Sequence, residues 1–279
     1  MRTELGIAWW MSRLGLIVLV CAVAMPYVMV PVDAQDPGDY IVTEWSADKL
    51  SLITPDGTRT VIYTFPGGTG PVFTAIDGAG NYIVTELYTE TLSRITPAGT
   101  RAVIYTFPGG TQPYGVAIDG AGNYIVAEYG ADILSRITPS GTRTVIYTFT
   151  GGTRPLGVAI DGAGNYIVTE YGAYKLSRIT PSGTRTVIYN FGFYQPYGVA
   201  IDGAGNYIVA EYGANILSRI TPSGTRTVIY TFAPNTQPLG VAVVGAASGQ
   251  VPTLTPIGLI ALVSLLAAIA SVAIVRKRR

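Results

Sequence analysis

The sequence predicts an all-β protein, a five-bladed β-propeller with four antiparallel strands in each blade. Near-copies of one unit recur at spacings of 42, 42, 42 and 41 residues. The unit is marked by the letters NYIV or DYIV, which begin at Asp39, Asn81, Asn123, Asn165 and Asn206. Each copy holds short runs rich in Tyr, Ile, Val and Thr, bounded by turn residues. A period of this size is typical of a propeller blade, and five units occupy residues 39–244.

One unit, residues 123–164, shows where the strands should lie. The expected strands are Tyr124–Glu128, Ile133–Thr138, Thr142–Phe149 and Leu156–Asp161. Asp-Gly-Ala-Gly-Asn and Pro-Ser-Gly-Thr are typical of tight hairpins, because Gly and Asn tolerate positive φ. The strands are almost continuously apolar, as expected for sheets that neighbouring blades cover on both faces. A β-helix is the alternative architecture, although its coils are usually shorter and lack a hairpin at every connection.

The phase of the repeat predicts how the ring closes. The first unit begins at YIVTE, and the last copy ends with a spare innermost strand, Leu239–Val244. We expect this strand to complete the first blade as its fourth strand. Closure of this kind joins the two ends of the propeller and removes free sheet edges.

Two apolar segments flank the propeller, which we place at residues 35–245. Residues 1–34 read as a secretory signal peptide with an apolar core at 14–30, an N-terminal membrane anchor being the alternative. A linker at 246–256 precedes residues 257–275, nineteen residues without a charge that predict a transmembrane helix. The basic tail at 276–279 should stay cytoplasmic, which places the propeller on the extracellular face of the membrane or in the cell envelope.

The composition excludes several kinds of chemistry. The chain has no His, and its single Cys, Cys21, lies within the expected signal peptide. The mature chain should therefore lack a Ser-His-Asp triad, a Cys nucleophile and histidine metal ligands. Between residues 35 and 250 there are fifteen Asp and Glu against twelve Lys and Arg, a net charge of −3, which gives no electrostatic case for nucleic acid. No cofactor is expected, and a divalent cation such as Ca²⁺ is left open.

Two connections in each blade should meet at one rim of the propeller and form the candidate binding site. The candidate residues are Glu44, Trp45, Glu86, Glu128, Tyr129, Glu170, Tyr171, Tyr194, Tyr197, Glu211 and Tyr212. Aromatic rings stack on sugar faces, and carboxylates hydrogen-bond hydroxyl groups, so this rim predicts a ligand-binding surface. The alternative is architectural, with the aromatics packed between blades and each Glu capping a turn or paired with Arg94, Arg136, Arg178 or Arg219. No residue is assigned a catalytic or metal-binding role.

Two further features repeat in most or all units. Asp77, Asp119, Asp161 and Asp202 stand in IDGAGN turns with one carboxylate each, which favours hairpin caps over calcium sites. Arg59, Arg101, Arg143, Arg185 and Arg226 are expected to form a solvated ring of cations on the opposite face, which could meet an anionic envelope polymer.

The segment PYGVAIDGAGNYIVAEYGANILSRITPSG, Pro196–Gly224, resembles NHL-repeat, virginiamycin-B-lyase-like and SMP-30-like propellers. The resemblance extends over residues 39–244 and implies the propeller fold. The lyase branch uses a catalytic histidine, so the resemblance does not carry that activity to a chain without His. SMP-30-like propellers use acidic and amide metal ligands around the central channel, and a metal-dependent hydrolase of lactones or sugars is therefore the alternative function.

The C-terminal segment VPTLTPIGLIALVSLLAAIASVAIVRKRR resembles sorting signals of archaeal and bacterial surface proteins, with Val251–Pro256 as the recognition motif. This resemblance implies a sortase-like processing enzyme, the alternative being a permanent helix. The sequence thus predicts a cell-surface propeller that binds envelope glycan or a surface protein, or that serves as a structural element, and not an enzyme.

Overall fold

The computed structural model describes residues 40–54, 56–233 and 237–241. The expected signal peptide, linker, transmembrane helix and basic tail lie outside these residues. Within the described part of the chain, no helix is long and apolar enough to cross a membrane.

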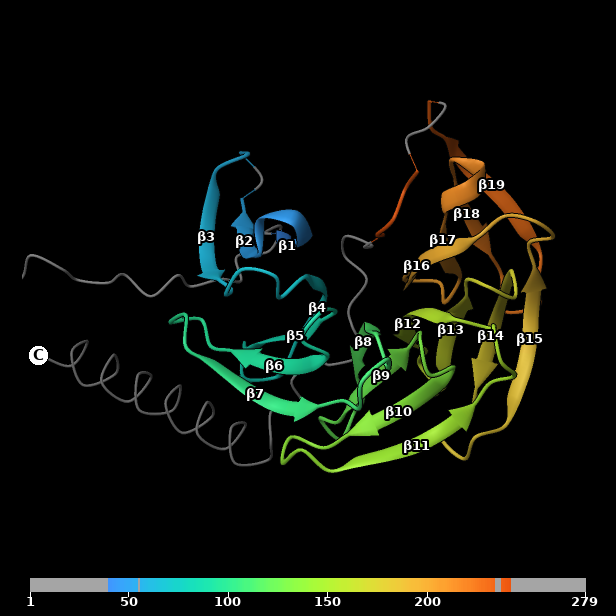
Figure 1. Ribbon diagram of the computed structural model, residues 1–279. Coiled ribbons are helices and arrows are strands. Elements are labelled where there is room, and N and C mark those ends of the chain that lie inside the picture. Colours follow the sequence, from blue (N-terminus) through green and yellow to red (C-terminus); the bar gives the residue numbers. More distant parts are fainter. Residues whose placement is uncertain (1–39, 55, 234–236, 242–279) are drawn as a thin grey trace, which may run out of the picture.

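The described residues form five antiparallel sheets, one for each repeat (Figure 1). Blade 1 contains β1 (Tyr40–Glu44), β2 (Lys49–Ile53) and β3 (Arg59–Thr64), with the 3-10 helix η1 (Trp45–Ala47) between β1 and β2. Blade 2 contains β4 (Pro71–Ile76), β5 (Tyr82–Glu86), β6 (Thr91–Ile95) and β7 (Arg101–Thr106). Blade 3 contains β8 (Pro113–Ile118), β9 (Tyr124–Glu128), β10 (Ile133–Ile137) and β11 (Arg143–Thr148). Blade 4 contains β12 (Pro155–Ile160), β13 (Tyr166–Glu170), β14 (Lys175–Ile179) and β15 (Arg185–Asn190). Blade 5 contains β16 (Pro196–Ile201), β17 (Tyr207–Glu211), β18 (Ile216–Ile220) and β19 (Arg226–Thr231), with the 3-10 helix η2 (Tyr212–Ala214) after β17.

The hairpins between the first two strands of a blade form as the sequence predicts. In blade 2 the Asp77 carboxylate accepts hydrogen bonds from the backbone N–H groups of Ala79, at 2.9 Å, and Asn81, at 2.8 Å. The side-chain amide of Asn81 also donates to this carboxylate. The same contacts recur at Asp119, Asp161 and Asp202. Each of these carboxylates is thus a turn cap, because local backbone and amide donors engage it.

The hydrophobic core lies between consecutive blades. One cluster joins Ile83, Leu92 and Phe107 of blade 2 to Tyr124 and Ile137 of blade 3. An equivalent cluster lies between blades 3 and 4. Because both faces of an inner blade are covered in this way, β5, β9 and β13 are buried along their whole length, and β17 of blade 5 is buried as well. The continuous apolar runs in these strands follow from this burial.

Adjacent blades approach most closely at the innermost strands β8, β12 and β16. A Cβ atom added at Gly115 would lie 2.3 Å from the carbonyl oxygen of Leu156, and one added at Gly157 would lie 2.6 Å from that of Tyr197. Only glycine fits so close to the next backbone. In β4 the corresponding residue is Phe73, whose ring stacks with Tyr197 at a centroid distance of 6.4 Å.

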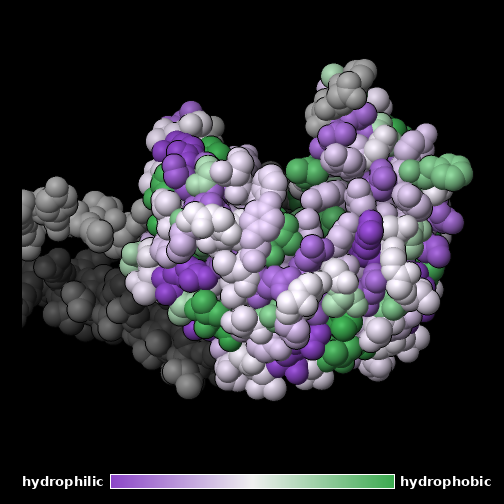
Figure 2. Space-filling model, viewed as in Figure 1, coloured by the Kyte–Doolittle hydropathy of each residue, from purple (hydrophilic) through white to green (hydrophobic). Residues whose placement is uncertain are grey.

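Blade 1 has three strands in the described structure, and this differs from the expected ring closure. Of the predicted closing strand, residues 239–241 are described and form no strand. The carbonyl oxygen of Leu239 accepts a 2.8 Å hydrogen bond from the N–H of Gly198, so this segment lies beside β16. Residues 242–244 lie outside the described structure. Blades 1 and 5 flank an opening in Figure 1, and the surface is notched at the same place in Figure 2.

The faces of the two terminal blades are correspondingly uncovered. Tyr230 of β19 is 57% exposed, whereas its equivalent Tyr189 of β15 is partly buried against the next blade. At the other end, Tyr40 of β1 is 46% exposed, whereas its equivalent Tyr82 of β5 is fully buried. Within the described residues, the five blades therefore form an arc whose end strands β1 and β19 are more exposed than their equivalents in the inner blades.

Candidate functional site

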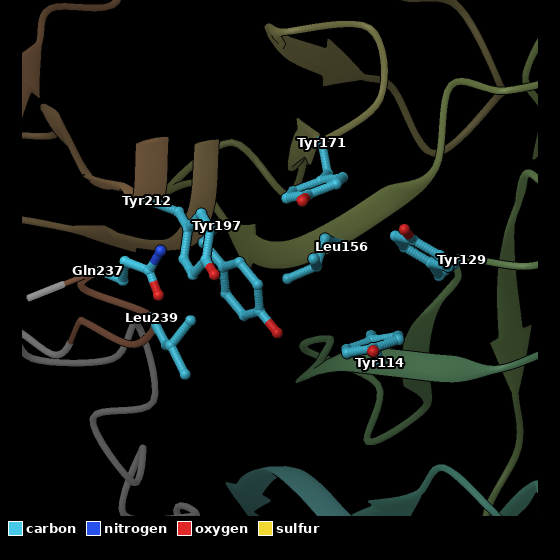
Figure 3. Close-up of a pocket in the computed structure, with 8 residues that line it drawn as sticks. All are labelled: Tyr114, Tyr129, Leu156, Tyr171, Tyr197, Tyr212, Gln237 and Leu239. Atoms are coloured by element: carbon cyan, nitrogen blue, oxygen red, sulfur yellow. The ribbon is translucent and has the colours of Figure 1, made fainter. Parts of the chain in front are cut away.

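Five tyrosines surround a cavity of about 470 Å³ at the rim of blades 3 to 5, and we call this cavity the tyrosine pocket (Figure 3). Its lining residues are Tyr114, Tyr129, Leu156, Tyr171, Tyr197, Tyr212, Gln237 and Leu239. The volume lies within the range of small-molecule sites, which is roughly 300–1,000 Å³.

The repeat places these residues at the pocket from two kinds of position. Tyr129, Tyr171 and Tyr212 each follow the buried Glu that ends β9, β13 or β17. Tyr114, Leu156 and Tyr197 each follow the Pro that begins β8, β12 or β16. Because both positions lie at the same end of the blades, successive repeats bring them together around one space (Figure 3).

The tyrosine rings form a continuous series around the pocket. Ring centroids are 5.1 Å apart for Tyr114 and Tyr129, and 6.0 Å apart for Tyr129 and Tyr171. The series continues through Tyr197, 6.2 Å from Tyr171, to Tyr212, 6.0 Å from Tyr197. Interplanar angles range from 32° to 88°, so the rings present both faces and edges. Such a wall offers large apolar contact area with hydroxyl groups at its edges.

The pKa values of three pocket phenols, those of Tyr114, Tyr171 and Tyr197, lie above the ordinary value for tyrosine. Burial raises the pKa of Tyr114, and the neighbouring phenol of Tyr129 adds to the effect. Burial likewise raises the pKa of Tyr171 and of Tyr197, with contributions from the surrounding tyrosines. These three phenol groups are therefore neutral hydrogen-bond donors and acceptors at physiological pH.

The rim glutamates were predicted to bind ligand, but each is paired with an arginine of its own blade. Glu128 is fully buried and accepts hydrogen bonds from Nε and Nη2 of Arg143, both at 2.7 Å, and from Oγ of Ser135, at 2.5 Å. The same bidentate pairing joins Glu44 to Arg59, Glu86 to Arg101, Glu170 to Arg185 and Glu211 to Arg226. None of these five glutamates is among the residues that line the tyrosine pocket.

These pairs correct two expectations about the arginines. Arg59, Arg101, Arg143, Arg185 and Arg226 are not a ring of solvated cations, because each reaches across its blade to a glutamate. The arginines of the other set have different partners from the ones expected. Arg136 and Arg178 donate to the phenol oxygens of Tyr166 and Tyr207 in the next blade, at 2.7 and 2.8 Å.

The pairing also lowers the pKa of two of these carboxyls, those of Glu86 and Glu44. Burial of Glu86 acts to raise its pKa, but hydrogen bonds from Arg101 and Thr91 outweigh it, and the pKa lies below its ordinary value. At the exposed end of the series, the hydrogen bonds of Ser51 and Arg59 lower the pKa of Glu44. These carboxyls are therefore ionised and engaged at neutral pH.

The remaining predicted rim residues lie outside the tyrosine pocket. Trp45 is half exposed on η1, with its ring 5.9 Å from that of Tyr88. Tyr194 is 49% exposed in the connection before β16 and does not line the pocket. Tyr129, Tyr171, Tyr197 and Tyr212 are thus the predicted residues that the structure brings together.

Four lining residues were not among the predicted candidates: Tyr114, Leu156, Gln237 and Leu239. Three of them occupy the repeat position of Tyr197, directly after the Pro of an innermost strand or of its C-terminal copy. That shared position was the signal that could have identified them. Gln237 occupies the position two residues earlier, where the connection enters the rim.

The connections between blades are held by capping side chains at the rim. Asp48 accepts hydrogen bonds from the N–H groups of Gly68 and Gly70, at 2.9 and 2.7 Å. Three side chains at the equivalent position also accept hydrogen bonds from backbone N–H groups of the connection that follows their blade. They are Glu90 of blade 2, Asp132 of blade 3 and Asn215 of blade 5. In blade 4 the equivalent residue is Tyr174, which packs against the core between blades 4 and 5. Across the described residues, no three or more Asp, Glu, Cys or His side chains are grouped as metal ligands would be.

The family model described as "Virginiamycin B lyase family" matches residues 21–261. No curated protein sequence matches the chain.

Several solved structures superpose on the propeller. Virginiamycin B lyase from Staphylococcus aureus shares 26% identity, with a TM-score of 0.64 over 74% of this chain and 71% of that one. A catalytically inactive form of that enzyme, with a histidine replaced by alanine and quinupristin present, shares 26% identity, with a TM-score of 0.62 over 76% of each chain. Regucalcin from Agrobacterium tumefaciens, described as a calcium-binding protein, shares 16% identity, with a TM-score of 0.63 over 76% of each chain, and this likeness concerns the fold alone.

Proposed function

Because the chain belongs to the virginiamycin B lyase family and carries a tyrosine-walled cavity at its rim, we propose that it is a binding propeller whose tyrosine pocket holds a glycan. The proposal includes a location at the outer face of the cell envelope, which the signal peptide and C-terminal span expected from the sequence support. The pocket itself is the observation on which the proposal depends.

The chemistry of the lining favours binding of a neutral, hydroxyl-bearing ring. Sugars present apolar C–H faces that stack on aromatic rings, and hydroxyl groups that exchange hydrogen bonds with phenols and amides. Tyr129, Tyr171 and Tyr197 supply both kinds of contact, and Gln237 adds an amide. Among the described residues, those that line the pocket include no carboxyl, imidazole or thiol group that could act as a general acid or base near neutral pH.

Lyase activity is not part of the proposal. The inactive lyase variant with quinupristin carries alanine in place of a histidine, and the present chain has no histidine at any position. The metal-dependent hydrolase expected as an alternative needs carboxylate ligands, and the buried glutamates of the described residues are each engaged by an arginine. A binding role is therefore the function that this geometry supports best.

The test is a glycan array probed with the full-length chain in mild detergent, followed by titration of any bound glycan. Tyr171→Ala removes a central ring of the pocket, and we expect it to weaken binding about five- to tenfold, since a lost aromatic contact is worth about 1–1.5 kcal/mol. Tyr194→Ala is the matched control, because Tyr194 is an exposed rim tyrosine outside the pocket. We expect it to leave binding unchanged.

A silent array, or equal losses in both variants, would refute the proposal. A divalent ion that raises the melting temperature while no glycan binds would instead favour the hydrolase alternative. Binding of an envelope protein that is lost in Tyr194→Ala and kept in Tyr171→Ala would indicate a binding surface on the outer rim and not in the tyrosine pocket.

A further inference from the structure

A positively charged side chain beside the tyrosine pocket indicates what kind of glycan the pocket would bind. This inference rests on the proposed function. Each connection that leads to the pocket has one residue directly before the Pro that precedes the lining residue. In successive repeats this residue is Gln112, Arg154, Gln195 and Gln237. Arg154 is thus the cation at a position where the other three connections carry an amide.

Arg154 lies beside two of the pocket tyrosines. Its Cζ atom is 5.6 Å from the centroid of the Tyr129 ring, a cation–π distance. Its carbonyl oxygen accepts a 3.0 Å hydrogen bond from the N–H of Tyr171. The guanidinium charge also acts on the Tyr171 phenol, where it opposes the rise in pKa that burial causes. The cation is therefore held at the pocket rim, between the blade 3 and blade 4 tyrosines.

No carboxylate in the described structure forms an ion pair with Arg154, in contrast to the eight arginines that do pair. Asp132 caps the connection that contains Arg154, and its oxygens accept hydrogen bonds from the backbone N–H groups of Gly152, at 2.8 Å, and Arg154, at 2.5 Å. Asp132 is thus engaged by the backbone of the connection, and the guanidinium donors of Arg154 remain available to a ligand.

The rim is also least acidic on the side of the pocket. The capping position is acidic in blades 1 and 2, where it is Asp48 and Glu90. In blades 3 to 5, which supply the pocket, it is Asp132, Tyr174 and Asn215, so a single carboxylate remains. The glutamates that directly precede Tyr129, Tyr171 and Tyr212 in the sequence, Glu128, Glu170 and Glu211, are buried, and each forms an ion pair with an arginine.

We infer that the tyrosine pocket takes a glycan that bears a carboxylate, such as a uronic acid, with the sugar ring against the tyrosines and the carboxylate at Arg154. A planar guanidinium binds a carboxylate through two parallel hydrogen bonds, which are stronger than hydrogen bonds between neutral groups. A neutral glycan would use the same tyrosine wall and leave Arg154 unpaired, so the carboxylate should add affinity to the contacts that the proposed function already requires.

The test compares two forms of one oligosaccharide, tetragalacturonate and its fully methyl-esterified form, in titrations of the full-length chain in mild detergent. Esterification removes the charge and keeps the sugar rings. We expect the free acid to bind about tenfold more tightly, which corresponds to one charge-assisted contact of about 1.4 kcal/mol. Raising the salt concentration should reduce this preference and leave the affinity for the ester unchanged.

Arg154→Gln installs the residue that neighbouring connections carry, so the backbone conformation should be retained. We expect this variant to bind acid and ester equally, at the wild-type affinity for the ester. Lys175→Gln is the matched control, since it removes a cation from β14 of the same blade without changing a lining residue. It should keep the preference for the acid.

The outcomes separate the inference from the proposed function. Equal binding of acid and ester by the wild-type chain overturns the inference and leaves the glycan-binding function in place. A preference for the acid that survives Arg154→Gln, or that Lys175→Gln also abolishes, overturns the assignment to Arg154. Binding of neither form removes the inference, and if the glycan array is silent as well, the proposed function fails with it.

Discussion

The five Glu–Arg pairs offer a controlled measure of what burial adds to an ion pair in this fold. Glu128 and Glu44 have the same contacts, a bidentate arginine and a serine hydroxyl, with bond lengths that agree within 0.1 Å. They differ in exposure, since the Glu128 side chain is fully buried and that of Glu44 is 26% exposed. Glu44 is exposed because no blade precedes blade 1 in the described structure.

We predict that Glu128→Ala lowers the free energy of unfolding by about 3–5 kcal/mol, because it leaves the Arg143 guanidinium charged and largely buried without a partner. Glu44→Ala should cost less than about 1 kcal/mol, since water can solvate Arg59, which is 42% exposed. For a domain of about 200 residues, each kcal/mol shifts the melting temperature by roughly 2–4 °C, so the two variants should differ by several degrees.

The assay is thermal and urea unfolding of the full-length chain, followed by tyrosine fluorescence and circular dichroism. A third variant, Glu128→Ala with Arg143→Met, removes both charges and should recover part of the loss. Equal losses for Glu128→Ala and Glu44→Ala would refute the reasoning, since it would mean that Glu44 is as buried in solution as Glu128 and that another surface covers blade 1. A double variant no more stable than Glu128→Ala would show that the unpaired guanidinium is not the cause.

Three further predictions follow from packing and charge. Tyr189→Ala should destabilise the fold by about 2–3 kcal/mol, because its ring packs between blades 4 and 5, whereas the equivalent Tyr230→Ala at the uncovered end should cost less than about 1 kcal/mol in unfolding measurements. Equal effects would contradict an open end at blade 5. Gly157→Ala should destabilise by about 1–3 kcal/mol, since its Cβ would meet the Tyr197 carbonyl oxygen at 2.6 Å, and Gly162→Ala, with no atom within 4 Å of its Cβ, should be nearly neutral. The lowered pKa of Glu86 means that its contribution to stability is complete above its unfolded pKa near 4.5 and is lost as the pH falls through the lower folded pKa. Melting temperatures measured from pH 7 to pH 2 should therefore fall below about pH 4.5, and Glu86→Gln should flatten that fall. An unchanged profile in Glu86→Gln would exclude this carboxyl as a source of acid lability.

The sequence by itself determined the features that depend on neighbouring residues and on the period of the repeat. The spacing of NYIV gave the number of blades, and the predicted strand Tyr124–Glu128 has the bounds of β9. The IDGAGN turns were predictable because Asp77 and its equivalents bind backbone amides two and four residues away. Interactions this local are encoded in adjacent letters, so no knowledge of the fold is needed to identify them.

The tertiary structure decided which of the repeated residues could meet a ligand. Glu128 and Tyr129 are neighbours in the sequence, yet Glu128 is buried against Arg143 and Tyr129 lines the pocket. Their partners lie on other strands and other blades, so the arrangement of the sheets in space selects them. The same holds at the ends, where residues 239–241 lie beside β16 and form no strand with β1. A closing strand can pair with β1 only if the two ends of the arc are close enough. The distance between those ends depends on the curvature of all five blades together, so no single repeat encodes it.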